Sequence, residues 1–250
     1  GLYMMGVLSP SGNMRPFDAA ADGMVWGEVC SALVLQAEAP EENAYVTVLP
    51  SAANCNNALS PSGFVAADMI QAAAEDALAL AGITAQQLAA CHPHGMGNTP
   101  SDVPELTGLV AALATARDSE LVLLGHKANF GHSVCAAGLV SVMVSALALQ
   151  QRVVPAHLNV ETQLDIVRDA KGVLLPVGSH ALLGSVGITL CTSISGTSVS
   201  GDNVHMVLQC HPGNRQQEIG AIAQATPLIG GATLCENCEE NAANVSCDEC

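Results

Sequence analysis

The chain alternates short apolar runs with longer stretches in which apolar side chains recur at helical spacing. Residues 45–49 form a short run with β-branched side chains and residues 121–124 are apolar throughout, so both runs predict strands. Residues 65–81 place apolar side chains one helical turn apart and end before Gly82, which predicts a helix with a glycine stop. Residues 204–210 alternate and form the last expected strand. Strands separated by helices predict an α/β layered fold.

The most apolar segment resembles a membrane span in composition but not in length. Residues 128–151 carry no formal charge, and residues 136–149 are almost wholly apolar. A bilayer requires roughly 20 apolar residues, so the strongly apolar part is too short to cross one. We therefore expect a central buried helix that begins near Ser133, and no membrane span.

Composition narrows the classes of protein to which the chain can belong. Apolar residues make up 50% of the 250 residues and charged residues 12%, which excludes intrinsic disorder for most of the chain. The 23 acidic and 7 basic residues give a net charge of −16 and form no basic stripe, so a nucleic-acid partner is not expected. Because the sequence begins at Gly1 without a charged signal region, we expect a processed chain or a fragment.

Six of the ten cysteines are scattered through residues 1–210, and most have apolar neighbours in the sequence. This usage suits reduced, buried thiols and a reducing compartment, such as the cytoplasm or a plastid. After Cys210 the sequence loses its periodicity. We therefore divide the chain into a folded part, residues 1–210, and a linker with an acidic, cysteine-rich tail, residues 211–250.

The tail ends in two CxxC pairs, formed by Cys235, Cys238, Cys247 and Cys250. Four thiols in two pairs are the ligand set of a structural zinc site. However, the loop between the pairs is short and the flanking residues lack the glycine or proline of a typical zinc knuckle. A disordered acidic tail with free thiols is therefore the favoured interpretation, and zinc the alternative.

Four segments of the folded part together resemble a known family. They are residues 9–23 (SPSGNMRPFDAAADG), 94–105 (HGMGNTPSDVPE), 127–138 (KANFGHSVCAAG) and 200–208 (SGDNVHMVL). In this order and spacing they are similar to the C-terminal half of a β-ketoacyl synthase, closest to the modular, type I polyketide synthases. The resemblance implies a thiolase-like α/β fold, in which a mixed five-stranded sheet packs on the buried helix and carries further covering helices.

The resemblance also implies an activity and its residues. Such enzymes are acyltransferases that catalyse the decarboxylative Claisen condensation of malonyl-carrier protein with an acyl thioester in polyketide or fatty-acid synthesis. His94 and His132 would hold the malonyl carbonyl and its enolate, Lys127 would act electrostatically, and Glu105 would be the acidic partner of that lysine. The expected partners are an acyl carrier protein with its phosphopantetheine arm and a second copy of the enzyme; no cofactor of the chain's own is expected.

Two pairs of residues also fit capping boxes, in which the first and fourth residues satisfy backbone groups at a helix start. Thr84 and Gln87 would open a short helix after residue 83. Asp102 and Glu105 would open a helix over residues 103–116. For Glu105 this structural role is compatible with the role that the resemblance implies.

The sequence departs from the family pattern in four places. The family's HGTGT motif appears here as residues 94–98 (HGMGN), and its GEGxG stretch as residues 27–31 (GEVCS). The loop that completes the family's oxyanion hole has two competing registers here, residues 193–197 and residues 198–203, and neither contains the usual phenylalanine. The candidate loop residues are Ile194, Thr197, Gly201 and Asn203. No cysteine has the sequence context of the family's nucleophile.

The missing nucleophile leaves two interpretations open. Either the chain is a fragment of a synthase, inactive when isolated, or it is a non-catalytic subunit or pseudo-enzyme that pairs with a complete synthase. Because half of a thiolase-like fold would leave one sheet face uncovered, we also expect the isolated chain to self-associate or to behave as a partly molten species.

Overall fold

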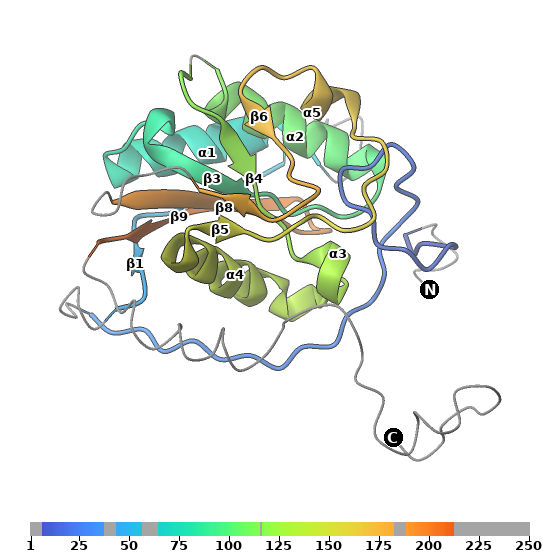
Figure 1. Cartoon of the computed structure of the whole chain (residues 1–250), viewed down its shortest axis with the longest axis horizontal. Helices are drawn as coiled ribbons and strands as arrows, with labels where there is room; N and C mark the ends of the chain where they lie inside the picture. The colour runs from blue at the N-terminus through green and yellow to red at the C-terminus, as the bar shows by residue number, and fades with distance from the viewer. Residues whose placement is uncertain (1–6, 38–43, 57–64, 116, 183–188, 213–250) are drawn as a thin grey trace. The chain divides into compact units, whose positions relative to one another are not determined.

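A mixed β-sheet with helices on both faces forms the centre of the structure (Figure 1). The computed structural model describes residues 7–37, 44–56, 65–115, 117–182 and 189–212. The strands of the sheet are β1 (Thr47–Val48), β2 (Ala52–Cys55), β3 (Leu88–His92), β4 (Leu121–Leu123), β6 (Val173–Leu174), β8 (Leu190–Thr197) and β9 (Asp202–Cys210). Their order is β1-β9-β8-β3-β4-β6, and β2 also pairs with β9.

The sheet is mixed, as expected, but it has seven strands rather than five. Two features account for the difference. The extended edge segment is divided into β1 and β2, which pair with successive parts of β9, and the two-residue β6 is added beyond β4. Strands β8, β3, β4 and β6 run parallel to one another, whereas β9 is antiparallel to β8.

The helices divide between the two faces of the sheet (Figure 1). Helices α1 (Ala67–Ala81) and α2 (Thr99–Leu113) cover one face, and α4 (Ala137–Gln151) covers the other. The remaining elements are short: η2 (Ala85–Gln87), α3 (Lys127–Phe130), η3 (Val134–Ala136), α5 (Asp165–Arg168) and the separate pair β5 (Val153–Val154) and β7 (His180–Ala181).

Local signals in the sequence set the end of α1 and the start of η2. Gly82 adopts a left-handed conformation with φ 66°, and its N–H donates to the carbonyls of Ala79 and Leu78, which confirms the glycine stop. The capping box of Thr84 and Gln87 is also present, but it opens a three-residue 3₁₀ helix that leads directly into β3.

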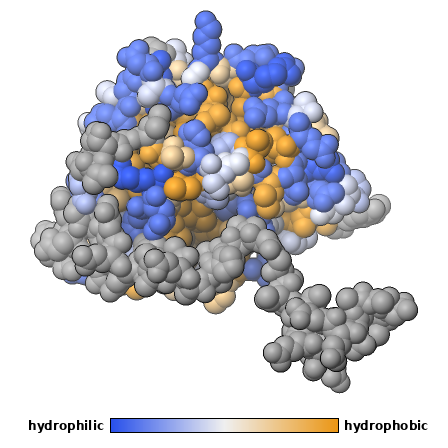
Figure 2. All heavy atoms as spheres, viewed as in Figure 1, coloured by the Kyte–Doolittle hydropathy of each residue, from blue (hydrophilic) through white to orange (hydrophobic). Residues whose placement is uncertain are grey.

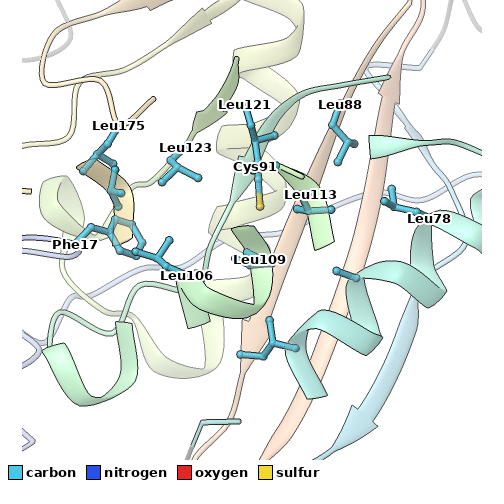
Figure 3. Close-up of a cluster of buried hydrophobic side chains, with 14 of the residues drawn as sticks. Phe17, Leu78, Leu88, Cys91, Leu106, Leu109, Leu113, Leu121, Leu123 and Leu175 are labelled. Carbon is cyan, nitrogen blue, oxygen red and sulfur yellow. The ribbon is translucent and has the colours of Figure 1, made fainter. Parts of the chain in front are cut away.

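Two apolar clusters hold the layers together. The larger lies between the sheet and α1 and α2, and Figure 3 shows its leucines around the Cys91 thiol and the Phe17 ring. The smaller lies on the α4 side, where Leu149 of α4 joins Ile194 of β8 and Leu208 of β9. Aliphatic side chains dominate both clusters, since aromatic residues make up only 2% of the sequence.

Helix α4 is buried on one face only, which corrects the expectation of a central buried helix. Its inner face packs on β8 and β9, whereas Leu139, Met143 and Leu147 are exposed. These three residues lie one helical turn apart and form a stripe on the outer face. The expected uncovered sheet face is therefore not observed, because α4 covers it and presents its own apolar stripe instead. Apolar surface between polar regions is also visible in Figure 2.

Residues 134–151 form one stretch that is long and apolar enough to cross a membrane by length and composition alone. In the fold this stretch comprises η3 and α4, and the packing of α4 on β8 and β9 makes it a covering helix.

The thiols are less uniformly buried than the sequence suggested. Cys91, Cys191 and Cys210 are buried, whereas Cys30, Cys55 and Cys135 are exposed; all six are free. Strand β9 ends at Cys210, as expected. The four tail cysteines lie outside the described residues, so the zinc and free-thiol alternatives, and the assignment of residues 211–250, remain predictions.

Candidate active site

The candidate site lies where two neighbouring parallel strands end. Strands β3 and β4 pair in parallel, so the loops that follow them leave the sheet at the same edge. The loop after β3 carries His94, and the chain after β4 continues through α3 to His132. The topology thus brings together two histidines that are 38 residues apart in the sequence.

The rings of His94 and His132 face each other edge to face. Their centroids are 5.1 Å apart and their planes are inclined by 72°. Both residues were candidates from the sequence, and the structure brings them together. The Nε2 of His94 is buried and has no hydrogen-bond partner among the described residues.

A backbone hydrogen bond sets the tautomer of His132. The N–H of Val134 donates to His132 Nδ1 at 3.1 Å, so in the neutral ring the hydrogen lies on Nε2. Val134 has a φ of 48°, an uncommon conformation for a β-branched residue, which turns its N–H back toward the ring. Burial and the nearby Lys127 charge lower the pKa of His132 to about 4, so the ring is a neutral donor at neutral pH.

The N-terminal segment holds both histidine loops by backbone hydrogen bonds. His132 N–H donates to the carbonyl of Val25 at 2.7 Å, and Gly27 N–H donates to the carbonyl of His132 at 3.1 Å. Gly23 N–H donates to the carbonyl of Gly97, in the His94 loop, at 2.9 Å. Residues 23–27 therefore fix the spacing between the two loops.

Asp102 and Glu105 do not form the expected capping box. Helix α2 begins earlier, at Thr99, and its N-cap is Asn98, whose side chain accepts from Ser101 N–H. Proline in the first turn allows this early start. Asp102 lies about one helical turn and Glu105 nearly two turns inside α2, and both carboxylates point at the His94 loop.

These carboxylates bind consecutive backbone N–H groups of the His94 loop. Glu105 accepts from His94 at 2.5 Å and from Gly95 at 2.9 Å. Asp102 accepts from Met96 at 2.8 Å and from Gly97 at 3.1 Å. Burial raises the pKa of Asp102 to about 7 and raises that of Glu105, although these hydrogen bonds oppose the shift.

Lys127 reaches the same loop from the opposite side. Its Nζ donates to the carbonyl of His94, and both its ammonium group and Glu105 are buried. Burial lowers the pKa of Lys127 to about 8, while the charges of Glu105 and Asp102 oppose this shift. The lysine and Glu105 thus interact electrostatically, as the resemblance implied, but each binds a backbone group of His94.

The candidate oxyanion-loop residues lie in β8, β9 and the turn between them. Residues 193–197 belong to β8, and Ile194 packs in the core opposite His92, so this register is a strand and not a loop. The turn between β8 and β9 lies in the other expected register, residues 198–203, where Gly201 has a φ of 90°. Thr197 lies at the end of β8, and the Asn203 side chain donates to Asn54 and Asn56 on the β2 side.

Several residues of the site were not recognised in the sequence as site residues. His126 and His157 are buried beside His92 and Phe17 and line a cavity next to His94. The sequence contained only a weak indication that His126 belongs to the site, namely that it immediately precedes the candidate Lys127. Among the described residues, no three His, Cys, Asp or Glu side chains are placed to hold a metal ion.

Comparison with known proteins agrees with this arrangement. Residues 45–161 match the family model described as the β-ketoacyl synthase C-terminal domain, and residues 1–40 match that of its N-terminal domain. The chain belongs to the β-ketoacyl synthase family. The range matched to the C-terminal domain contains both His94 and His132.

Relatives and solved structures of ketosynthases give the same assignment. The chain is 31% identical, over 92% of its length and 11% of the relative's, to a mycocerosic acid synthase-like polyketide synthase of Mycolicibacterium smegmatis. It is 32% identical, over 89% of its length and 14% of the relative's, to a hybrid synthetase of Botryobasidium botryosum. The chain therefore spans a small part of the relatives it matches.

The fold is that of solved ketosynthases. It matches the ketosynthase from module 6 of the bacillaene synthase of Bacillus subtilis with a TM-score of 0.78 at 24% identity, covering 84% of this chain and 39% of that chain. It matches an oxazolomycin ketosynthase domain of a Streptomyces species with a TM-score of 0.72, over 83% and 38% of the two chains. The thiolase-like fold class is therefore confirmed.

Proposed function

We propose that this chain supplies the malonyl-decarboxylating part of a ketosynthase site. The observation that carries the proposal is the edge-to-face pair of His94 and His132, whose ring centroids are 5.1 Å apart. Burial lowers the pKa of both imidazoles, so each is neutral at neutral pH and has one N–H to donate. Two such donors aimed at one oxygen are the arrangement that an enolate requires.

The reaction moves one electron pair through that oxygen. Breaking the bond between the malonyl carboxylate and its methylene carbon releases carbon dioxide, and the bonding pair moves onto the thioester oxygen. The N–H groups of His94 and His132 stabilise this negative charge without giving up a proton. The enolate carbon then attacks an acyl thioester, the new carbon–carbon bond forms, and the thiolate of the acyl thioester leaves.

Lys127, Glu105 and Asp102 keep the His94 ring in place during this step. Glu105 and Lys127 bind the N–H and the carbonyl of His94, while Asp102 binds the next part of the loop. The Lys127 ammonium also adds positive charge close to both imidazoles, which keeps them neutral and favours the enolate. These three side chains position the donors that contact substrate.

The thiol that carries the acyl group lies outside the described residues in this proposal. Burial raises the pKa of Cys91 to about 12, so it is not a thiolate. The exposed Cys30, Cys55 and Cys135 lack the sequence context of the family's nucleophile; Cys55 also donates to Asp202, and Cys135 follows His132 in η3. We assign the acyl-bearing cysteine to the family's N-terminal domain. Only residues 1–40 of this chain match the model of that domain.

The proposed substrates are malonyl and acyl thioesters carried on the phosphopantetheine arm of an acyl carrier protein. The proposed complete enzyme is a homodimer in a reducing compartment, the cytoplasm or a plastid. Support for the substrates comes from the polyketide synthases that the chain resembles, and support for the reducing compartment from the free thiols of the described residues.

The test requires a complete ketosynthase, made by joining this chain to the N-terminal domain of a polyketide synthase relative. Release of labelled carbon dioxide from malonyl-carrier protein and acyl loading of the cysteine are measured together. His94→Ala and His132→Ala should each slow decarboxylation by about a hundred- to a thousandfold and affect loading less. His205→Ala, a buried position on β9, is the control for stability. If both histidine variants decarboxylate at the unmodified rate, the proposal is wrong.

A further inference from the structure

Phe17 has a backbone conformation that few aromatic residues adopt. Its φ is 68°, in the left-handed region, although its side chain is buried in the larger apolar cluster (Figure 3). A bulky residue is an outlier in this region and stays there only where the surrounding structure holds it. Phe17 belongs to residues 9–23, a segment that resembles the family, yet it takes no part in the proposed reaction.

Backbone hydrogen bonds on both sides hold Phe17 in this conformation. Its N–H donates to Asp102 Oδ2 at 3.1 Å, and its carbonyl accepts from the N–H of Leu164 at 2.9 Å. The next residue, Asp18, is also buried, and its carboxylate accepts from the N–H groups of residues 161 and 162 at 2.7 Å each. Phe17 is therefore tied both to α2 and to the chain just before α5.

Asp102 also joins Phe17 to the His94 loop. The same buried carboxylate accepts from the N–H of Met96 at 2.8 Å and from that of Gly97 at 3.1 Å. One side chain thus connects the backbone of Phe17 to the residues two and three positions after His94. A displacement of Phe17 would therefore be transmitted to this loop.

The ring of Phe17 lies directly against the residue that follows His94. A Cβ on Gly95 would be 2.8 Å from Phe17 Cζ and 3.2 Å from Pro16 Cβ, so any other residue at position 95 would push against the ring. The ring also contacts the His157 imidazole edge to face, with the centroids 5.8 Å apart. Because Phe17 is buried and its backbone is fixed, its ring limits how far the loop can move toward residues 16–17.

We propose that Phe17 is a positioning residue for the catalytic candidate His94. Buried charged side chains already bind the backbone of His94 by polar contacts, and Phe17 adds a steric contact at the next residue. The N-terminal segment also binds the His132 loop through residues 23–27. One segment therefore contacts both loops, and its contact through Phe17 sets the distance between the two imidazoles. Phe17 acts on the substrate only through His94.

This proposal rests on the proposed function only where it concerns decarboxylation. The distance between the two imidazoles is a property of the substrate-free chain and can be measured there. A misplacement of about 1 Å in a reacting group can slow a reaction about a hundredfold. Loss of the contact between Phe17 and Gly95 should therefore slow decarboxylation in the complete ketosynthase, with little effect on substrate binding.

The test is a double-mutant cycle at Phe17 and Gly95, measured in the complete ketosynthase described above. Gly95→Ala places a Cβ against Phe17 Cζ, and Phe17→Leu removes Cζ and leaves the loop without its contact. Each substitution alone should slow decarboxylation about tenfold or more. Together they should slow it by less than the product of the two single effects, because the new methyl group occupies space that the ring has left.

Two substitutions control for effects that do not involve this contact. Gly12→Ala introduces the same backbone strain, since Gly12 has a φ of 71°, but its Cβ would meet nothing within 4 Å. Leu113→Val removes packing from the same apolar cluster at the far end of α2. Both should leave the decarboxylation rate unchanged, and Leu113→Val should lower the melting temperature. For Phe17→Leu, kcat should fall, whereas KM for malonyl-carrier protein and acyl loading should not change.

Nuclear magnetic resonance measures the position of the His94 ring without substrate. In the unmodified chain, an Overhauser contact should join the His94 and His132 rings, whose centroids are 5.1 Å apart. Phe17→Leu and Gly95→Ala should each weaken this contact, and the double variant should restore it. An unchanged contact in both single variants would overturn the proposal. If Gly95→Ala does not fold, the double variant should restore folding, and its failure to do so would contradict the contact.

The outcomes separate this proposal from the proposed function. Multiplicative effects of the two substitutions on decarboxylation would overturn the role given to Phe17. If Phe17→Leu leaves decarboxylation unchanged while His94→Ala slows it, Phe17 is not a positioning residue and the proposed function stands. If His94→Ala also leaves the rate unchanged, the proposed function is wrong, and the contact between the rings in the substrate-free chain decides whether Phe17 positions His94.

Discussion

Glu105 and Lys127 meet at His94 rather than at each other. Glu105 accepts from the backbone N–H of His94 at 2.5 Å, and Lys127 Nζ donates to the carbonyl of the same residue. The two oppositely charged side chains therefore bind the N–H and the carbonyl of the same residue, His94. Because both side chains are buried, they fix the orientation of the His94 ring. This relationship has consequences for both stability and catalysis.

Glu105→Gln should reduce the free energy of unfolding by about 1–3 kcal/mol. The amide can accept through one oxygen only, so either His94 or Gly95 keeps a buried N–H without an acceptor. Urea denaturation measures the loss. Glu75→Gln, at an exposed position on α1, is the matched control and should change stability by less than about 0.5 kcal/mol. Equal effects of the two substitutions would contradict the role given to Glu105.

The free energy of unfolding should fall between pH 6.5 and pH 4. Burial lowers the pKa of six histidines. The pKa falls from 6.5 to about 3 for His126, to about 4 for His132, His157 and His205, and well below 6.5 for His92 and His94. Between these values the unfolded chain binds protons that the folded chain does not, so acid favours unfolding. Asp102 and Glu105 oppose this trend, because burial raises the pKa of both carboxyls, to about 7 for Asp102, so the folded state binds protons that the unfolded state has already released.

Six imidazoles against two carboxyls give the net fall. Urea denaturation at several pH values measures it, and His205→Gln, which removes one of the six imidazoles, should reduce the slope. A free energy of unfolding that stays constant or rises on acidification over this range would show that the imidazoles are not buried in the neutral form.

Gly27→Ala should displace the His132 loop, whereas Gly138→Ala should be tolerated. A Cβ on Gly27 would overlap the carbonyl oxygen of Phe130, a backbone atom that cannot move away by itself. A Cβ on Gly138, in α4, meets nothing within 4 Å, and alanine favours a helix by about 0.5–1 kcal/mol. The His132 ring resonances and the thermal melting temperature report the two outcomes. Similar effects of both substitutions would argue against the backbone contact of residues 23–27 with the loop.

The isolated chain should self-associate through the outer face of α4. Leu139, Met143 and Leu147 are 40%, 36% and 46% exposed and lie on one side of the helix. Contiguous apolar surface of this kind favours association. Sedimentation should show a concentration-dependent increase in mass that Leu139→Glu combined with Leu147→Glu removes. Leu80→Glu, at an exposed position on α1, should leave it unchanged. A monomer at all concentrations would refute this prediction.

The chain alone should not become acylated when it is incubated with acyl-carrier protein. Burial raises the pKa values of Cys91, Cys191 and Cys210, which keeps these thiols protonated. Intact-protein mass spectrometry measures acylation. Stoichiometric, site-specific acylation of the exposed Cys55 or Cys135, lost on substitution by alanine, would show that the chain contains its own nucleophile.

The sequence by itself determined the features that depend on neighbours in the chain. Gly82 ends α1 because only a left-handed residue closes the helix there, and the Thr84 capping box satisfies its own backbone groups. His94 and His132 were recognisable because their glycine loops belong to motifs of the family. In each case the determining interactions span a few residues, so the local sequence contains the information.

Tertiary structure alone decided how distant residues meet. Asp102 and Glu105 have the spacing of a capping box, yet buried N–H groups of the His94 loop compete for the carboxylates and bind them instead. The hydrogen bond between His92 and His126, 34 residues apart, exists because β3 and β4 are parallel neighbours. A stripe of apolar residues on α4 cannot reveal which side the sheet covers. Strand pairing and the satisfaction of buried polar groups decide these features, and both depend on contacts between segments far apart in the sequence.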